Sequence, residues 1–297
     1  MKDISIDLPA KTAFSAKECL WFLNRGFDDC MYKVHPDKIR RAFQYNDELM
    51  LTDIYITTRG LKISWLTSEP SFQAIDYVKT FVVNWFDLDN DLQLFYGKLS
   101  QNTALAYMPS SYYGLRFVGM PDLFETLSWA IIGQQINLTF AYKMKRRLVE
   151  YYGTSIEYQD EHYYLFPSPQ TIALAKIEDL REMQLSHKKA EYLIIAAKAL
   201  TSGEISKKIL LEQPDFSSRI KLLTNLKGIG LWTANYVLMK SLKEPSCIPH
   251  GDAGLIKALI NHNILKEKND LSPMNHLFEN FKGWESYLVF YLWRSLA

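Results

Sequence analysis

Hydrophobic and polar residues alternate in different ways before and after about residue 112. In the first part, short β-type runs lie between two stretches that carry apolar residues at helical spacing. The expected helices cover residues 16–25 and 74–86, and the expected strands cover residues 49–58 and 61–66, with a hairpin turn at Arg59-Gly60. This pattern predicts a small α+β domain over residues 1–112, built on an antiparallel sheet.

The second part, residues 113–297, carries few strand signals. Helical segments follow one another between proline and glycine breaks, and we expect helices at residues 124–132, 141–152, 188–200, 231–242 and 253–260. We therefore predict an all-α domain here, and an α+β fold class for the whole chain. The sequence contains neither a repeat of fixed period nor a low-complexity tract, which argues against a solenoid.

Composition excludes some classes of protein and leaves others open. Hydrophobic residues make up 48% and charged residues 23%, as in an ordinary globular protein. No apolar run approaches the roughly 20 residues of a membrane span, so we expect a cytoplasmic protein without membrane contact. We also expect a monomer. Cys19, Cys30 and Cys247 lie far apart, which favours reduced thiols over disulfides. No residue set has metal-ligand spacing, and we expect neither a metal nor a cofactor.

Net charge does not identify a partner, because 34 basic residues face 33 acidic ones. A case for nucleic acid must rest on local features. The strongest is Gly228-Ile229-Gly230, where two glycines allow a tight turn and a close backbone approach to a ligand. The apolar helix expected next would point its free amides and positive dipole end outward from this turn, an arrangement suited to phosphate.

Asp252 lies just before another expected helix, after the loop Pro249-His250-Gly251. An aspartate there is commonly an N-cap, which needs no catalytic role. Both roles can coexist, because helix amides favour the anionic form of the carboxyl group. Such an anion suits a reaction that builds positive charge on a sugar, as in cleavage of a glycosidic bond.

Several motifs in order resemble those of the helix-hairpin-helix base-excision glycosylases, and in particular the alkylpurine branch, DNA-3-methyladenine glycosylase II. They are WAIIGQQ at residues 129–135, FPSPQ at 166–170, HKKAE at 187–191, GIGLWTANY at 228–236, and Asp252. The first part of the chain resembles the TBP-like sheet domain of that branch more faintly. The resemblance implies a DNA-repair enzyme that acts on double-stranded DNA containing alkylated bases.

The resemblance also implies roles for individual residues. Gly228 and Gly230 would hold a backbone phosphate through their amides, and Thr233 could add a hydroxyl contact. Gln134 and Gln135 fall where the family places the wedge that fills the space left by a flipped nucleotide. Their alternative role is a helix-capping or surface amide pair.

The catalytic carboxylate implied by the family is Asp252. Trp232 and Tyr236 match positions whose rings line the base pocket, although both could equally be core residues of a buried helix. An aromatic face suits a methylated, cationic base. Phe22 is expected to face the same pocket, with Trp21 as the competing assignment.

Strand-cutting relatives carry a lysine nucleophile two residues after the second hairpin glycine, where this chain has Trp232. The resemblance therefore favours a monofunctional glycosylase that uses water and leaves an abasic site. Two alternatives stay open: a bifunctional oxidised-purine glycosylase/lyase, and a non-catalytic helix-hairpin-helix protein that only binds DNA.

Two further features bear on the site. The best-known members of the branch extend past the final helix with another pocket tryptophan, whereas this chain ends shortly after Trp293, which puts the shape of the pocket in doubt. Basic residues also gather at Lys143, Lys145, Arg146 and Arg147, and again at residues 187–189. Such runs are either solvated helix faces or phosphate contacts.

Overall fold

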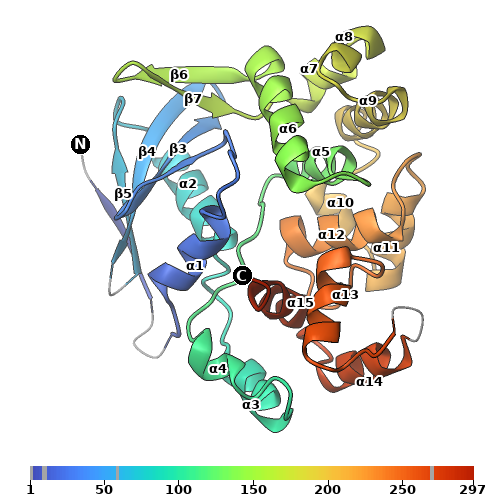
Figure 1. The fold of residues 1–297 in the computed structure, drawn as a ribbon. Helices are drawn as coiled ribbons and strands as arrows, with labels where there is room; N and C mark the ends of the chain where they lie inside the picture. Colours follow the sequence, from blue (N-terminus) through green and yellow to red (C-terminus); the bar gives the residue numbers. More distant parts are fainter. Residues whose placement is uncertain (1–2, 9–11, 58–59, 268–270) are drawn as a thin grey trace.

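An antiparallel sheet forms one side of the molecule and a group of helices forms the other (Figure 1). The structure is a computed structural model and describes residues 3–8, 12–57, 60–267 and 271–297. The predicted turn at Arg59-Gly60 lies partly outside these residues, because Arg59 is not described. Among the described residues, no helix is long and apolar enough to cross a membrane.

The first part of the chain builds the sheet in the order β1-β5-β4-β3-β2, with every pair antiparallel. Its elements are β1 (Ile4–Asp7), α1 (Ala16–Leu23), β2 (Lys33–Val34), β3 (Lys38–Tyr45), β4 (Glu48–Thr57), β5 (Gly60–Trp65), α2 (Phe72–Trp85), α3 (Gln93–Gln101) and α4 (Met108–Ser111). Ile39, Ile54 and Ile63 lie opposite one another on adjacent strands and are fully buried. Their side chains share one face of the sheet, since strand residues alternate between faces.

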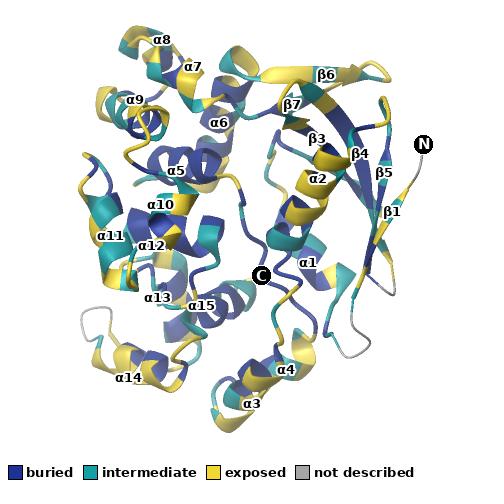
Figure 2. Cartoon of the chain, turned by 180° about the vertical axis from the view of Figure 1, so that it is seen from behind, coloured by how far each residue is buried: buried dark blue, intermediate teal, exposed yellow. Residues whose placement is uncertain are grey.

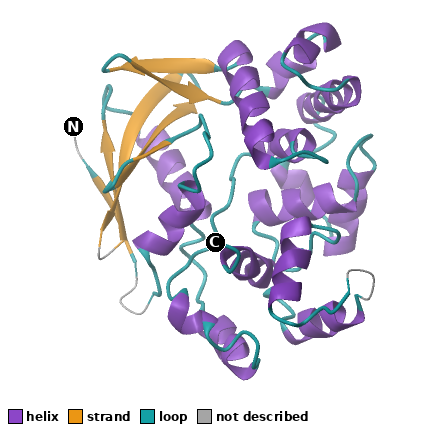
Figure 3. Cartoon of the chain, in the orientation of Figure 1, coloured by secondary structure: helices purple, strands orange, loops and turns teal. Residues whose placement is uncertain are grey.

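The second part is mainly helical (Figure 3). Its elements are α5 (Leu123–Ile132), α6 (Leu138–Tyr152), β6 (Thr154–Tyr158), β7 (Glu161–Leu165), α7 (Pro169–Ala173), α8 (Ile177–Glu182), α9 (His187–Thr201), α10 (Lys207–Leu211), α11 (Phe216–Thr224), α12 (Leu231–Leu242), α13 (Ala253–Asn261), α14 (Ser272–Asn280) and α15 (Glu285–Arg294). The helices predicted from periodicity are confirmed here to within a few residues, and so is the antiparallel sheet of the first part.

The prediction of an all-helical second part was wrong at residues 154–165. These residues form the hairpin β6–β7, which packs against β3 and β4 of the first sheet. Tyr163 and Leu165 are buried there together with Ala42 and Leu51. The hairpin is therefore stabilised by a surface that comes from the other part of the chain, which no local pattern in residues 154–165 could reveal.

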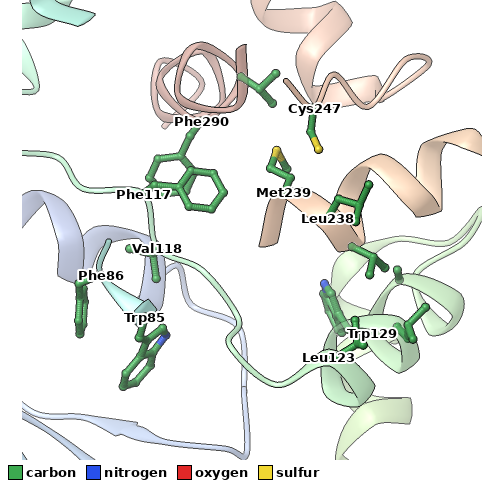
Figure 4. Close-up of a cluster of buried hydrophobic side chains, with 14 of the residues drawn as sticks. Trp85, Phe86, Phe117, Val118, Leu123, Trp129, Leu238, Met239, Cys247 and Phe290 are labelled. Carbon is green, nitrogen blue, oxygen red and sulfur yellow. The ribbon is translucent and has the colours of Figure 1, made fainter. Parts of the chain in front are cut away.

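A buried extended segment, residues 115–121, joins the two parts of the chain. Arg116 is fully buried, and its guanidinium donates to the carbonyls of Asp87 and Asn90. Figure 4 shows Phe117 and Val118 of this segment among buried side chains from both parts. The segment and its surroundings are dark in Figure 2, which marks burial. The proposed domain boundary after residue 112 thus falls close to a packed connection and stays a prediction.

A buried ionic cluster ties the sheet part to the helical part. Lys145 on α6 donates to Asp29 and to Glu125, each at 2.9 Å, and Arg41 on β3 lies 3.3 Å from the second oxygen of Glu125. Burial acts to raise the pKa of Glu125, but Lys145 and Arg41 outweigh it and hold that pKa below its usual value. The cluster places α6 and α5 against the sheet and the loop that follows α1.

Replacing Lys145 by Met should lower the free energy of unfolding by about 3–5 kcal/mol, because two buried carboxylates lose their shared cation. Urea denaturation at neutral pH measures this loss. The control is Lys143→Met, which removes the same charge from an exposed position two residues earlier on α6 and should change stability by less than about 0.5 kcal/mol. A Lys145→Met protein as stable as the control would show that the cluster contributes little.

Candidate active site

The glycine hairpin precedes α12 and presents unpaired amides. Gly228 has a φ of 90°, and a Cβ at this position would lie 2.2 Å from the ring of Tyr192 on α9. In the described part of the chain, the amides of Gly228 and Gly230 have no hydrogen-bond acceptor. Gly230 is the N-cap of α12 and offers no side chain to its first turn. The loop can therefore receive an external acceptor such as a phosphate.

Gln134 holds this hairpin from the turn after α5. Its side-chain amide donates to the Gly228 carbonyl at 3.0 Å and to the Thr233 hydroxyl at 3.2 Å. Thr233 is only 2% exposed, and its hydroxyl accepts from Gln134 instead of facing solvent. Gln135 is exposed and has a φ of 55°, which turns the chain sharply at this point. The phosphate contact of Thr233 and the wedge role of the two glutamines stay predictions.

One face of α12 carries Trp232, Tyr236 and Lys240, spaced four residues apart and therefore in line along the helix. The rings of Trp232 and Tyr236 stack with centroids 5.3 Å apart and planes 19° apart. Trp129 on α5 donates its indole N–H to the Tyr236 hydroxyl at 3.0 Å. Burial raises the pKa of this hydroxyl, which keeps Tyr236 uncharged.

Asp252 is half-buried and is the N-cap of α13, as its sequence position predicted. Its Oδ1 accepts from the Leu255 amide at 2.7 Å and from the indole Nε1 of Trp293 at 2.9 Å. Its Oδ2 receives only a longer contact, 3.4 Å from the indole Nε1 of Trp232. One carboxylate oxygen is thus firmly held, and the other keeps acceptor capacity beside the aromatic stack.

Trp293 is a site residue that sequence reasoning missed. It stands at the end of α15, with its ring centroid 6.4 Å from that of Tyr236, and it bonds Asp252. The doubt about the shape of the pocket therefore changes, because Trp293 at the end of α15 supplies a further tryptophan beside Asp252. The available signal was the apolar spacing of α15, which brings Trp293 to the same face as other buried rings. Only the packing of α15 against α13 showed where that face points.

Next to this aromatic group lies a narrow pocket of about 30 Å³ between the two parts of the chain. Phe22 from α1 and Tyr236 both line it, whereas Asp252 and Trp232 do not and meet it through Tyr236. Trp21 faces elsewhere, with the Arg294 guanidinium 4.7 Å from its ring centroid. The structure therefore favours Phe22 over Trp21 as the pocket residue. Its contact with a base stays a prediction.

The basic run on α6 does not form one DNA-facing group. Lys145 is buried in the ionic cluster, and Arg146 pairs with Asp28 and Glu150. Phosphate contact by Lys145 was therefore a wrong hypothesis, because the fold uses its charge internally. In the second run, Lys189 donates to the Ile132 carbonyl at 2.8 Å and helps to position the turn that carries the glutamines.

The cysteines and the possible metal ligands can be located in the structure. All three cysteines are free and buried, as predicted. Within the described ranges, no group of three or more His, Cys, Asp or Glu side chains could hold a metal ion. The polar groups next to the Trp232–Tyr236 stack include Asp252 and the indole N–H groups of Trp232 and Trp293.

Comparison with known proteins gives one consistent family. Residues 128–282 match the model of the HhH-GPD superfamily of base excision DNA repair proteins. The chain is 37% identical over 299 residues to the DNA-3-methyladenine glycosylase of Bacillus subtilis, covering 99% of this chain and 97% of the relative. It is 29% identical over 195 residues to DNA-3-methyladenine glycosylase 2 of Escherichia coli, covering 65% and 64% of the two chains.

Solved structures share the fold. The 3-methyladenine DNA-glycosylase from Archaeoglobus fulgidus matches with a TM-score of 0.82 at 24% identity, over 99% of this chain and 97% of the other. The 8-oxoguanine glycosylase/lyase of Clostridium acetobutylicum matches with a TM-score of 0.74 at 18% identity, over 98% and 97%. The hairpin, Asp252 and the aromatic group lie in the part of the chain that the family model covers, apart from Phe22 and Trp293. The chain belongs to the HhH-GPD superfamily of base excision DNA repair proteins.

Proposed function

We propose that this protein is a monofunctional DNA glycosylase that flips alkylated purines such as 3-methyladenine out of double-stranded DNA and hydrolyses the N-glycosidic bond. The observation that carries the proposal is the Asp252 carboxylate, held by two indole N–H groups and a helix amide beside the Trp232–Tyr236 stack. Support also comes from the Bacillus subtilis relative, which matches nearly the whole chain and is named DNA-3-methyladenine glycosylase, and from the Escherichia coli relative named DNA-3-methyladenine glycosylase 2.

The chemistry follows from the charge of Asp252. When the bond between base and deoxyribose breaks, the sugar gains oxocarbenium character, and a nearby anion stabilises it. At about 4 Å and an effective dielectric near 20, this attraction amounts to about 4 kcal/mol, or roughly a thousandfold in rate. Water then adds to the sugar, which leaves an abasic site and a free base.

Binding of duplex DNA depends on the glycine hairpin and the glutamine turn. The unpaired amides of Gly228 and Gly230 suit a backbone phosphate, a contact that positions DNA without reading its sequence. The glutamine turn is bonded to this hairpin, so a nucleotide flipped beside the phosphate would leave its gap next to Gln134 and Gln135. The alternative of a protein that only binds DNA is less well supported, because binding alone does not require a carboxylate held by two tryptophans.

Asp252→Asn should reduce release of methylated bases at least about a hundredfold, because the anion is lost. Binding to DNA should persist, since Asn is an equally good N-cap. Chromatography of free methylpurines after incubation with methylated duplex DNA measures release. Asp215→Asn is the matched control, because Asp215 caps α11 in the same way but is exposed and lies outside the site. Unchanged release by Asp252→Asn would remove this carboxylate from the mechanism.

Gly228→Ala should weaken binding to duplex DNA by roughly ten- to a hundredfold, the value of a hydrogen bond to a charged group. The added Cβ meets the ring of Tyr192 and the φ is strained, so the amides must move. Fluorescence anisotropy with an abasic duplex gives the dissociation constant. Gly203→Ala carries similar φ strain with nothing within 4 Å of its Cβ, and should leave binding unchanged. Equal weakening by both variants would refute the phosphate role.

The monofunctional mechanism predicts that borohydride traps no covalent complex with alkylated DNA. Trp232 cannot form an imine, and the amine of Lys240, on the same helix face, is buried against the Val118 carbonyl. Denaturing gel electrophoresis after reduction separates a covalent protein–DNA complex from free DNA and therefore measures trapping. A trapped adduct would favour the glycosylase/lyase alternative, and its loss in Lys240→Met would identify the nucleophile.

A further inference from the structure

A cationic side chain lines the pocket between the two parts of the chain. Arg25 follows α1 and lines the pocket, with its guanidinium carbon 3.9 Å from the ring centroid of Phe22 and 5.7 Å from that of Phe27. Its Nε donates to the Phe22 carbonyl at 3.0 Å, which fixes the side chain over that ring. The guanidinium thus lies where a stacked base would meet Phe22.

The charge of Arg25 is not balanced by an ion pair. Asp29 and Glu125 line the same pocket, but Lys145 and Arg41 take up their charges. The ion pairs found among the described residues all involve other basic side chains and not Arg25. The positive charge therefore acts on whatever enters the pocket, and it is attenuated by solvent, by the aromatic rings and by the nearby carboxylates of Asp29 and Glu125.

The charge of Arg25 affects the pKa values of two other residues that line the pocket, Lys240 and Tyr142. Burial lowers the pKa of Lys240 well below its usual value, and the Arg25 guanidinium lowers it further. Burial also raises the pKa of Tyr142, an effect that the same guanidinium partly opposes. Lys240 lies 4.2 Å from the Phe22 centroid, so two basic side chains share one ring. The pocket thus disfavours a further positive charge.

We propose that Arg25 is a specificity-determining residue of the pocket, whose charge lowers the preference of the enzyme for cationic methylpurines relative to uncharged bases with a hydrogen-bond acceptor. This inference rests on the proposed function. A purine methylated at N3 or N7 is cationic in DNA, whereas a purine such as hypoxanthine is uncharged and offers O6 and N7 as acceptors. The guanidinium N–H groups can donate to such atoms.

Like charges about 6 Å apart, at an effective dielectric of about 40, change an equilibrium constant roughly tenfold. A change of roughly tenfold is large enough to alter which bases are preferred without abolishing activity. Cationic bases leave DNA more readily than uncharged ones, so the enzyme can accept a penalty on them. The effect is therefore expected in the ratio of rates on two kinds of base.

The test compares single-turnover rates on two probes at neutral pH. One is duplex DNA treated with dimethyl sulfate, which contains cationic methylpurines, and the other is a duplex with a single hypoxanthine. Arg25→Met should raise the ratio of methylpurine release to hypoxanthine release roughly tenfold. Arg25→Lys keeps the charge and should keep the ratio near that of the unmodified protein. Arg181→Met removes an exposed charge from α8 and should leave the ratio unchanged.

Each result of this test either supports the role of the Arg25 charge or overturns it. An Arg25→Met ratio within twofold of the unmodified protein, or an equal rise in Arg25→Lys, overturns the role of the charge. If hypoxanthine release is undetectable throughout, the proposal requires Arg25→Met to release methylpurines faster than Arg181→Met, and equal rates overturn it. Thermal unfolding shows whether the variants are folded. Absence of base release by the unmodified protein on either probe would instead contradict the proposed function.

Discussion

The hydrogen bonding of the Asp252 carboxylate next to aromatic rings is the interaction on which the rest of this site depends. A carboxylate among rings alone would lose its hydration without compensation. Asp252 avoids this cost because the Leu255 amide and two indole N–H groups donate to it, and because it stands at the N-terminal end of a helix. The tryptophans therefore serve two needs at once, since each is a ring surface and a hydrogen-bond donor.

The two parts of the chain cooperate to complete the pocket. The sheet part supplies Phe22 and Arg25, and the helical part supplies Tyr236 and Lys240. Their approach is held by the cluster around Lys145 and by the buried segment that contains Arg116. Such buried charges are stable only when each has its partner, which makes the relation between the two parts specific.

Charge is distributed unevenly over this pocket. Basic groups contact the faces of Phe22, while the carboxylate lies beyond the Trp232–Tyr236 stack. Under the proposed function, a base in the pocket would meet the positive charge of Arg25, whereas its sugar would meet the negative charge of Asp252. This separation suits a reaction in which the base departs with electrons and the sugar becomes positive. The electrostatic arrangement is thus consistent with the chemistry proposed for Asp252.

Sequence by itself determined the local features of this protein. The glycine hairpin, the buried α12 and the N-cap position of Asp252 follow from short-range spacing, because turns, helices and caps depend on residues a few positions apart. The motifs in order were also sufficient to identify the family.

Only the tertiary structure decided how these pieces meet. Trp293 and Asp252 are 41 positions apart and Arg25 lies over 200 residues before Tyr236, so no periodicity could place them together. The hairpin β6–β7 and the burial of Lys145 likewise depend on partners from the sheet part. Long-range packing sets these contacts, and a charge that looks exposed on its own helix can be internal once another part of the chain covers it.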